Sequence, residues 1–147
     1  MTLNANSTTA KPAGKLYVVA TPIGNASDIT TRAIETLAHA DVILCEEHRN
    51  GSRLLKSLGI AKPLLELNEH NETERIQEVL LMLAQGQTLA LISDCGTPVF
   101  SDPGKKLLQL LYEMNIAVTP LPGASSLMAA LSVCPFDLEE FLFIGFL

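Results

Sequence analysis

The chain has 147 residues, a length typical of one domain, and 48% of them are hydrophobic against 18% charged, which is the balance of a globular protein with a large core. No apolar run reaches the roughly 18 residues of a membrane-spanning helix, so a membrane protein is not expected. The net charge of −6 is uneven: residues 1–62 hold seven Lys and Arg against five Asp and Glu, whereas residues 63–147 hold three against eleven. Because phosphate neutralisation supplies much of the affinity for nucleic acid, binding of this kind would need a local basic patch.

Short apolar runs alternate with amphipathic stretches along the chain. The pattern predicts, in chain order, strand 16–20, helix 30–38, strand 41–46, helix 51–58, strand 63–67, helix 71–84, strand 88–93, helix 103–114, strand 117–121, helix 124–133 and strand 141–146. Thr30 is predicted to cap the first helix and Asp102 the fourth, with Pro103 at the first position of that helix. This alternation predicts an α/β fold with a mostly parallel sheet and helices on both faces.

The two ends of the chain differ in character. Residues 1–14 are polar and small, without the apolar core of a signal peptide, and are predicted to be a disordered leader before an α/β domain over 15–147. The last predicted strand runs into Gly145-Phe146-Leu147, and because a domain rarely stops on such an apolar stretch, a further segment is expected to follow. Three widely spaced cysteines fit neither a disulfide framework nor a zinc site, so no metal and a reducing cytoplasm are expected.

Three strand-to-helix loops are rich in Gly and Pro, at 20–28, 93–104 and 121–126. Any α/β protein collects these residues in its connections, but parallel sheets bind ligands beyond the carboxyl ends of their strands, and all three loops are expected at that edge. The glycine patterns of dinucleotide sites, P-loops and nucleophile elbows are absent. The loops therefore favour a ligand without phosphates, held by backbone and apolar contacts, such as S-adenosyl-L-methionine.

Three motifs in these loops carry a family resemblance. Residues 19–33 resemble the opening of the ribosomal RNA small-subunit methyltransferase I family, within the tetrapyrrole methylase superfamily. Ser93-Asp-Cys-Gly-Thr-Pro98 matches its Ser-Asp-Ala-Gly-Thr-Pro segment, and Pro120-Leu-Pro-Gly123 matches its Pro-Leu-Pro-Gly turn. The resemblance covers residues 16–147. It implies a homodimeric, two-domain, cytoplasmic methyltransferase of which this chain is the N-terminal, cofactor-binding domain, the C-terminal methylase domain being absent from the chain.

The resemblance also implies functional residues. S-adenosylmethionine would be lined by Pro22, Gly96, Thr97, Pro98, Val99, Ser101, Ser125 and Ser126. The family pattern Glu-Asp-Thr-Arg stands here as Glu46-Glu-His-Arg49, which implies catalytic, substrate-facing roles for Glu46, Glu47 and Arg49. A solvated, salt-bridged loop is the alternative for these residues, and it is favoured for His48 and His70.

The implied function is S-adenosylmethionine-dependent methylation of a cytidine ribose 2′-hydroxyl in 16S ribosomal RNA, with small-subunit ribosomal RNA or the 30S subunit as partner. The four cations Arg49, Arg53, Lys56 and Lys62 are the candidate contacts to RNA phosphate, or else a solvated helix face. One alternative is C-methylation of a porphyrin or corrin precursor, although such enzymes more usually carry Gly-Asp-Pro where this chain has Gly-Thr-Pro. Another is a non-catalytic, truncated binding or dimerisation module.

Overall fold

A five-stranded sheet forms the centre of the computed structural model, which describes residues 14–100, 102–137 and 139–145. The strands are β1 (Lys15–Val19), β2 (Val42–Cys45), β3 (Leu64–Glu66), β4 (Thr88–Ile92) and β5 (Val118–Leu121). They lie in the order β3-β2-β4-β1-β5, and every neighbouring pair is parallel. The predicted α/β fold with a parallel sheet is confirmed.

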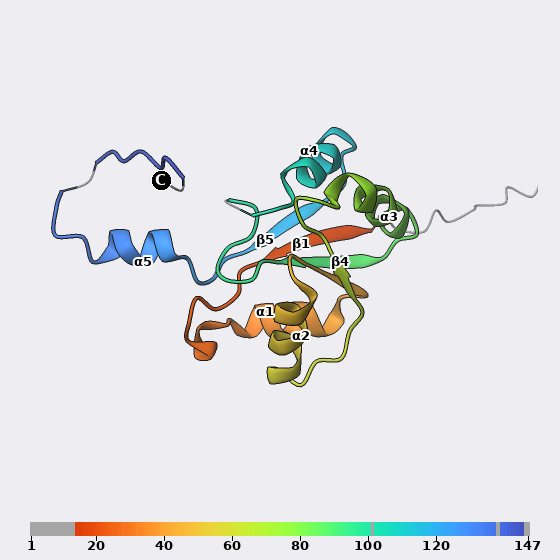
Figure 1. The fold of residues 1–147 in the computed structure, drawn as a ribbon, viewed down its shortest axis with the longest axis horizontal. Helices are drawn as coiled ribbons and strands as arrows, with labels where there is room; N and C mark the ends of the chain where they lie inside the picture. The colour runs from red at the N-terminus through yellow and green to blue at the C-terminus, as the bar shows by residue number, and fades with distance from the viewer. Residues whose placement is uncertain (1–13, 101, 138, 146–147) are drawn as a thin grey trace, which may run out of the picture.

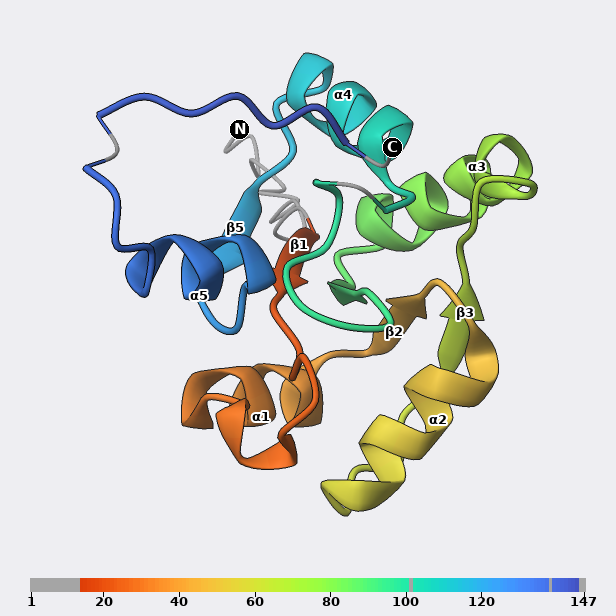
Figure 2. The same cartoon turned by 60° about the vertical axis from the view of Figure 1, so that its left-hand side comes forward.

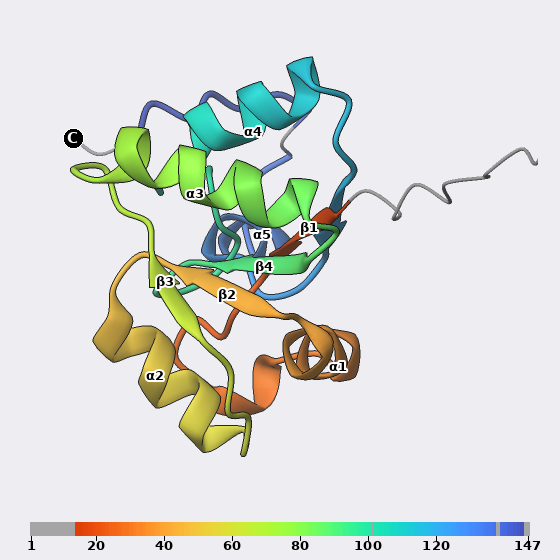
Figure 3. The ribbon, with the colours of Figure 1, turned by 90° about the vertical axis from the view of Figure 1, so that its right-hand side faces the viewer.

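Helices cover both faces of the sheet, as the sequence predicted. One face carries α3 (Glu72–Ala84) and α4 (Lys105–Glu113), and the opposite face carries α1 (Thr31–His39) and α2 (His48–Ser57), as Figures 1 and 3 show. Because successive strand side chains point to opposite faces, Leu44 joins the core under α3 and α4, whereas Ile43 joins the core under α1 and α2. Both residues are fully buried.

The connections that follow the neighbouring strands β1 and β4 lead to opposite edges of the sheet. From β1 the chain passes through α1 to β2, and from the neighbouring β4 it passes through α4, on the other face, to β5. The carboxyl ends of β1 and β4 therefore form a topological switch point, which is where open α/β sheets bind their ligands.

The helix predicted over 51–58 begins three residues earlier, at His48. The preceding Glu47 makes no capping hydrogen bond with its side chain; instead the backbone N–H of His48 donates to Oε2 of Glu66, at the end of β3, at 3.3 Å. Because this acceptor lies on β3, 18 residues further along the chain, the sequence around His48 does not indicate it.

The predicted start of α4 is wrong for a related reason. The helix begins at Lys105, so Pro103 is not its first residue, and Gly104 rather than Asp102 occupies the N-cap position, with φ of 113°. Glycine supplies the left-handed backbone but no capping side chain. The N–H groups of Lys106 and Leu107 donate instead to Oε1 of Glu72, on α3, at 3.1 and 3.2 Å.

The described C-terminal part lies beside the sheet (Figure 2). Helix α5 (Ser126–Ser132) has no buried residue. The strand predicted over 141–146 is wrong for residues 141–145, which are irregular. A strand exists only by pairing with another, and none of the five described strands pairs with these residues. Phe143 instead packs on Phe100, with ring centroids 4.5 Å apart; Phe146 lies outside the described residues.

The first residue that the structure describes is Gly14. This residue, which the sequence placed in the leader, is buried, and its N–H donates to the carbonyl of Leu83 at 2.9 Å. The rest of the predicted leader, 1–13, lies outside the described residues. Within the described part of the chain, no helix combines the length and apolar character needed to cross a membrane.

Candidate functional site

The loops after β1 and β4 are hydrogen-bonded to each other at the switch point. Thr21 and Gly96 form an antiparallel bridge, in which each N–H donates to the other's carbonyl, at 2.8 and 3.1 Å. The buried Thr21 hydroxyl also donates to the carbonyls of Ser93 and Gly96, at 3.3 and 3.4 Å. Gly96 has φ of 81°, and a Cβ there would lie 3.2 Å from Cγ2 of Ile23, so the close approach of the two loops requires glycine.

The loop after β5 joins the same surface. Oγ1 of Thr97 donates to the carbonyl of Ala124 at 3.2 Å. Gly123 packs so closely on the end of β1 that an added Cβ would lie 2.8 Å from Cβ of Ala20. The three predicted loops thus form one connected surface, termed here the rim platform: residues 20–28, 93–100, 102–104 and 121–126.

The described cofactor residues of the prediction all lie on this platform. Pro22 follows the bridging Thr21, Gly96 and Pro98 are buried, and Val99 is partly buried with an unusual φ of 76°. Oγ of Ser125 caps α5 by accepting the N–H of Met128 at 3.3 Å, and Ser126 is the exposed first residue of that helix. Ser101 lies outside the described residues.

Two cavities flank the platform. The first, named the α2 cavity, measures about 360 Å³ and lies between the loop after β1 and helix α2. Its lining residues are Thr21, Pro22, Gly24, Ala26, Asn50, Gly51, Arg53, Leu54, Ser57, Ile92, Ser93 and Asp94. Of the predicted cofactor residues that the structure describes, Pro22 alone is among them.

The second, named the acidic cavity, measures about 580 Å³ and lies on the α3 and α4 side. It is lined by Glu46, Glu47, Glu66, Asn68, Glu69, His70, Glu72, Asp102, Pro103, Gly104, Lys105 and Lys106. Two of the three predicted catalytic residues, Glu46 and Glu47, are therefore brought together, whereas Arg49 is exposed on the first turn of α2.

Two acids of this cavity, Glu46 and Asp102, have a pKa raised above the ordinary value, in both cases chiefly by partial burial. For Glu46, the nearby carboxylates of Asp94, Asp102, Glu69 and Glu47 raise the pKa further. A carboxyl group with a raised pKa at a ligand-binding edge is a candidate proton acceptor, because its basicity is closer to working pH. Within residues 14–100, 102–137 and 139–145, no three His, Cys, Asp or Glu side chains are arranged to hold a metal ion.

Asn50 is the functional candidate that sequence reasoning missed. Its Nδ2 donates to Oε2 of Glu47 at 2.9 Å and to Oδ2 of Asp94 at 2.6 Å. This hydrogen-bonded bridge separates the two cavities, since Glu47 lines the acidic cavity while Asn50 and Asp94 line the α2 cavity. Asp94 lies 44 positions away from Asn50 in the sequence, so no local pattern could have revealed the pair.

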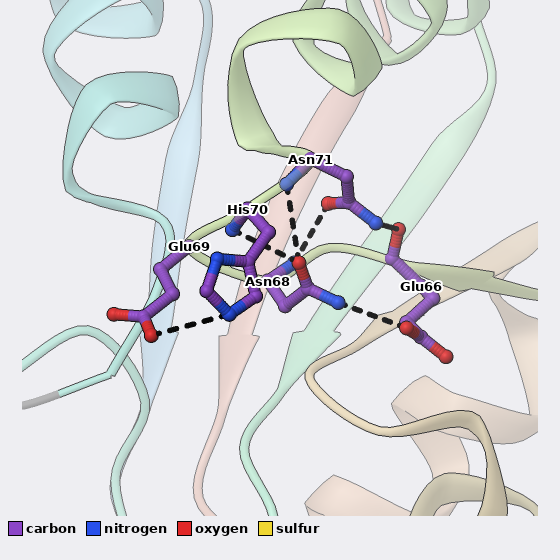
Figure 4. Close-up of polar contacts among 5 residues, drawn as sticks. All are labelled: Glu66, Asn68, Glu69, His70 and Asn71. Carbon is purple, nitrogen blue, oxygen red and sulfur yellow. Dashed lines mark hydrogen bonds and ion pairs between the residues drawn. The ribbon is translucent and has the colours of Figure 1, made fainter.

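A compact turn over residues 66–71 holds part of the lining of the acidic cavity in place (Figure 4). Oδ1 of Asn68 accepts the N–H groups of His70 and Asn71, at 3.0 and 3.1 Å, and Nδ2 of Asn68 donates to Oε1 of Glu66 at 2.8 Å. The His70 side chain is 85% exposed, with its Nε2 3.5 Å from Oε1 of Glu69. This placement agrees with the solvated-surface interpretation of His70.

Known proteins resemble this chain in sequence and in fold. A family model described as "Tetrapyrrole (Corrin/Porphyrin) Methylases" matches residues 15–147. The chain is 48% identical over 135 residues to "Ribosomal RNA small subunit methyltransferase I" of Leptospira biflexa, covering 91% of this chain and 56% of that protein. It is 47% identical over 134 residues to the protein of the same name from Synechocystis, covering 91% and 48%. The chain thus spans about half the length of the curated relatives it matches.

Among solved structures, a uroporphyrin-III-C-methyltransferase from Thermus thermophilus is 26% identical with a TM-score of 0.60, covering 86% of this chain and 54% of that one. The native form of Uroporphyrin III C-methyl transferase from the same organism is 21% identical with a TM-score of 0.63, covering 80% and 52%, and shows the shared fold. Because the family model covers almost all of the chain, as the motifs predicted, the protein belongs to the tetrapyrrole methylase family.

Proposed function

We propose that this chain is the cofactor-holding part of an S-adenosylmethionine-dependent methyltransferase that acts on small-subunit ribosomal RNA, at the ribose 2′-hydroxyl of a cytidine. The observation that carries the proposal is the rim platform, in which three motif-bearing loops are joined at the switch point. The substrate follows from the relatives, which are named ribosomal RNA small subunit methyltransferase I at 43–48% identity.

The platform is chemically suited to S-adenosylmethionine. Its three loops contain no Lys or Arg, so they lack the cations that a phosphate-bearing cofactor would attract, and they include Asp28, Asp94 and Asp102. An exposed carboxylate such as Asp94 can interact favourably with the positive charge of a sulfonium or with ribose hydroxyls. Pro22 and the Gly96–Val99 segment would hold the cofactor through backbone and apolar contacts, and Ser125 and Ser126 would contact its methionine part.

The bound cofactor supplies an electrophilic methyl group, and the protein must align an acceptor with it. Alignment in such a direct displacement can contribute about 7–11 kcal/mol. A ribose hydroxyl is a weak nucleophile, so its proton must leave to a nearby base. Glu46 is our candidate for that base because it lines the acidic cavity, keeps its place in the family pattern and has a raised pKa. Glu47, which accepts a hydrogen bond from Asn50, would lie beside it, and Arg49 would face the substrate.

The two alternatives have less support. C-methylation of a tetrapyrrole precursor rests on solved structures that share the fold at 21–26% identity, well below the identity to the ribosomal RNA methyltransferases. A non-catalytic module would not require the connected platform, and it predicts no binding of S-adenosylmethionine.

We also propose that the active enzyme contains a second domain and is a homodimer in the cytoplasm. The apolar surface around α5 supports the second domain, because Val133, Phe136 and Leu142 are 81%, 75% and 83% exposed. Exposed apolar patches of this kind commonly mark interaction surfaces. Light scattering on the chain before and after extension would give the oligomeric state.

Calorimetry tests the cofactor part of the proposal. S-adenosylmethionine is titrated into this chain and into the chain extended with the C-terminal part of the Leptospira biflexa relative. The variant Gly96→Ala is expected to weaken binding about tenfold, equivalent to roughly 1.4 kcal/mol, because alanine strains a left-handed backbone that also meets Ile23. The matched control is Gly59→Ala, with φ of 68° but open space around it and no place on the platform.

The control variant is expected to bind S-adenosylmethionine like the parent. Absence of binding heat from both the chain and its extended form would refute the proposal that the protein is an S-adenosylmethionine-dependent enzyme. Transfer of labelled methyl to small ribosomal subunits, measured beside a uroporphyrinogen substrate, decides the substrate: labelling of the porphyrinogen alone would overturn the ribosomal RNA assignment.

A further inference from the structure

Charge is unevenly distributed on the two sides of the Glu47–Asn50–Asp94 bridge. On one side lies the acidic cavity, where six carboxylates outnumber Lys105 and Lys106 and would repel RNA phosphates. On the other side, helix α2 carries the exposed cations Arg49, Arg53 and Lys56, spaced i, i+4 and i+7, so that they form one row along the helix. None of the ion pairs among the described residues involves these three cations.

The next row of α2 faces the α2 cavity. Asn50, Leu54 and Ser57 have the same i, i+4, i+7 spacing and line that cavity, and Arg53 lines it as well as belonging to the basic row. The cavity is near the lower end of the range for small-ligand sites, about 300–1,000 Å³, at about 360 Å³. It is therefore of a size for one small ligand, placed where the basic row meets the rim platform.

The lining has the chemistry of a nucleotide site. Leu54, which is partly exposed, offers apolar surface for a flat ring. The carboxylate of Asp94, which also lines the cavity, accepts a hydrogen bond from Nδ2 of Asn50. Both donor contacts of the Asn50 amide are made through Nδ2, and no hydrogen bond in the described part of the chain uses its Oδ1, which leaves an acceptor for a base amino group. Single-stranded RNA is commonly recognised through unstacked bases that contact such polar edges or stack on an arginine guanidinium.

We propose that the α2 cavity binds one unstacked nucleotide of the RNA strand, flanking the methylated one, with the phosphate of that nucleotide on Arg53. The inference rests on the proposed function only for the identity of the partner as RNA. The strand follows the Arg49–Arg53–Lys56 row, and the Asn50 bridge keeps its phosphates apart from the acidic cavity. An acidic protein can in this way bind RNA through the basic row of one helix and the cavity beside it.

Two measurements on the chain test this inference. Backbone amide NMR with ribonucleoside 5′-monophosphates is expected to give saturable shifts at Thr21, Asn50 and Ser93, with much smaller ones at Gly96–Val99. Inorganic phosphate is the reference ligand: equal shifts from phosphate would overturn the nucleotide assignment. Fluorescence anisotropy with a short single-stranded RNA then gives the affinity and its dependence on salt.

Paired variants separate charge from cavity shape. Arg53→Gln is expected to weaken RNA binding about tenfold, as for a lost hydrogen bond to a charged group, and to reduce the slope of log affinity against log salt by about 0.7. Its control, Arg32→Gln on α1, removes the same charge from an exposed residue outside the cavity and is expected to change neither. Ser57→Phe fills the cavity and is expected to lower affinity with an unchanged salt slope, whereas Ser52→Phe, which does not line the α2 cavity, is expected to bind normally.

Equal losses from both members of either pair would overturn the inference, and so would S-adenosylmethionine displacing the nucleotide from Asn50 and Ser93. The two proposals fail separately. Nucleotide binding in the α2 cavity, with no cofactor binding to either the chain or its extended form, would refute the methyltransferase function and leave the cavity assignment intact. Cofactor binding on the platform without nucleotide binding in the α2 cavity would refute the cavity assignment and leave the methyltransferase function intact.

Discussion

Glu72 is predicted to stabilise the protein by capping a helix to which it does not belong. Its side chain is only 6% exposed, and its Oε1 accepts the N–H groups of Lys106 and Leu107 at the start of α4. That helix has no side-chain cap of its own, because Gly104 holds the N-cap position. The carboxylate also lies where the positive end of the α4 dipole favours negative charge.

The magnitude follows from these contacts. Loss of a side-chain cap costs about 0.5–2 kcal/mol, and a buried N–H left without a partner costs about 1–3 kcal/mol. Because the two terms overlap, Glu72→Ala is expected to lower the free energy of unfolding by about 2–3 kcal/mol. Glu72→Gln keeps an oxygen acceptor and loses only the charge, so about 1 kcal/mol is expected.

Urea unfolding followed by circular dichroism measures these differences. Glu74→Ala is the matched control, since Glu74 lies in the same first turn of α3, carries the same charge and is exposed. It is expected to cost less than about 0.5 kcal/mol, as for an ordinary surface substitution. Equal destabilisation by Glu72→Ala and Glu74→Ala would refute the capping argument, as would a Gln variant no more stable than the Ala variant.

Two further predictions concern titrating groups. Burial and neighbouring carboxylates raise the pKa of Glu46, so the folded protein holds this proton more tightly than the unfolded chain does. The protonated side chain therefore favours the folded state in acid, and this contribution to the free energy of unfolding is lost as pH rises through the raised pKa. Glu46→Gln should therefore flatten the mildly acidic part of the stability profile without lowering stability at neutral pH, and a loss at neutral pH would contradict this. Burial, with Glu66 and Asp94, raises the pKa of Cys45 to about 11, so a colorimetric thiol reagent should modify exposed Cys95 in the native protein and Cys45 only after unfolding; fast native reaction of Cys45 would count against its burial.

Local signals in the sequence determined most of the secondary structure and the position of the site. Thr30 was identifiable as a helix cap because its acceptor and donor lie within one turn, and its Oγ1 accepts the N–H of Ala33 at 3.1 Å. Strands β2 and β4, in the middle of the sheet, were identifiable because a parallel strand covered on both faces is apolar on both sides. The edge strand β5 is covered less completely, since Thr119 and Pro120 are exposed. Once the strands were placed, their order along the chain required the three Gly- and Pro-rich loops to lie at one edge.

The tertiary structure alone decided how those loops are joined and what lies between them. The bond from His48 to Glu66 spans 18 residues, the Glu72 cap of α4 spans 34 and 35, and the bridge from Asn50 to Asp94 spans 44. Each partner is an ordinary polar residue in its own segment, so no window of sequence marks it. The predicted strand at 141–146 was wrong for residues 141–145 for the same reason, since these residues are apolar enough for a strand but pair with none of the strands that the structure describes.

The sequence by itself therefore determined the family, the α/β fold and the edge of the sheet that carries the site, because these depend on periodicity and on motifs within a few residues. Only the folded chain decided the separation of an acidic cavity from a cavity beside the basic row of α2, with Asn50 between them. The physical reason is that a hydrogen bond or a charge contact depends on distance in space, and the sheet brings together segments that are far apart along the chain.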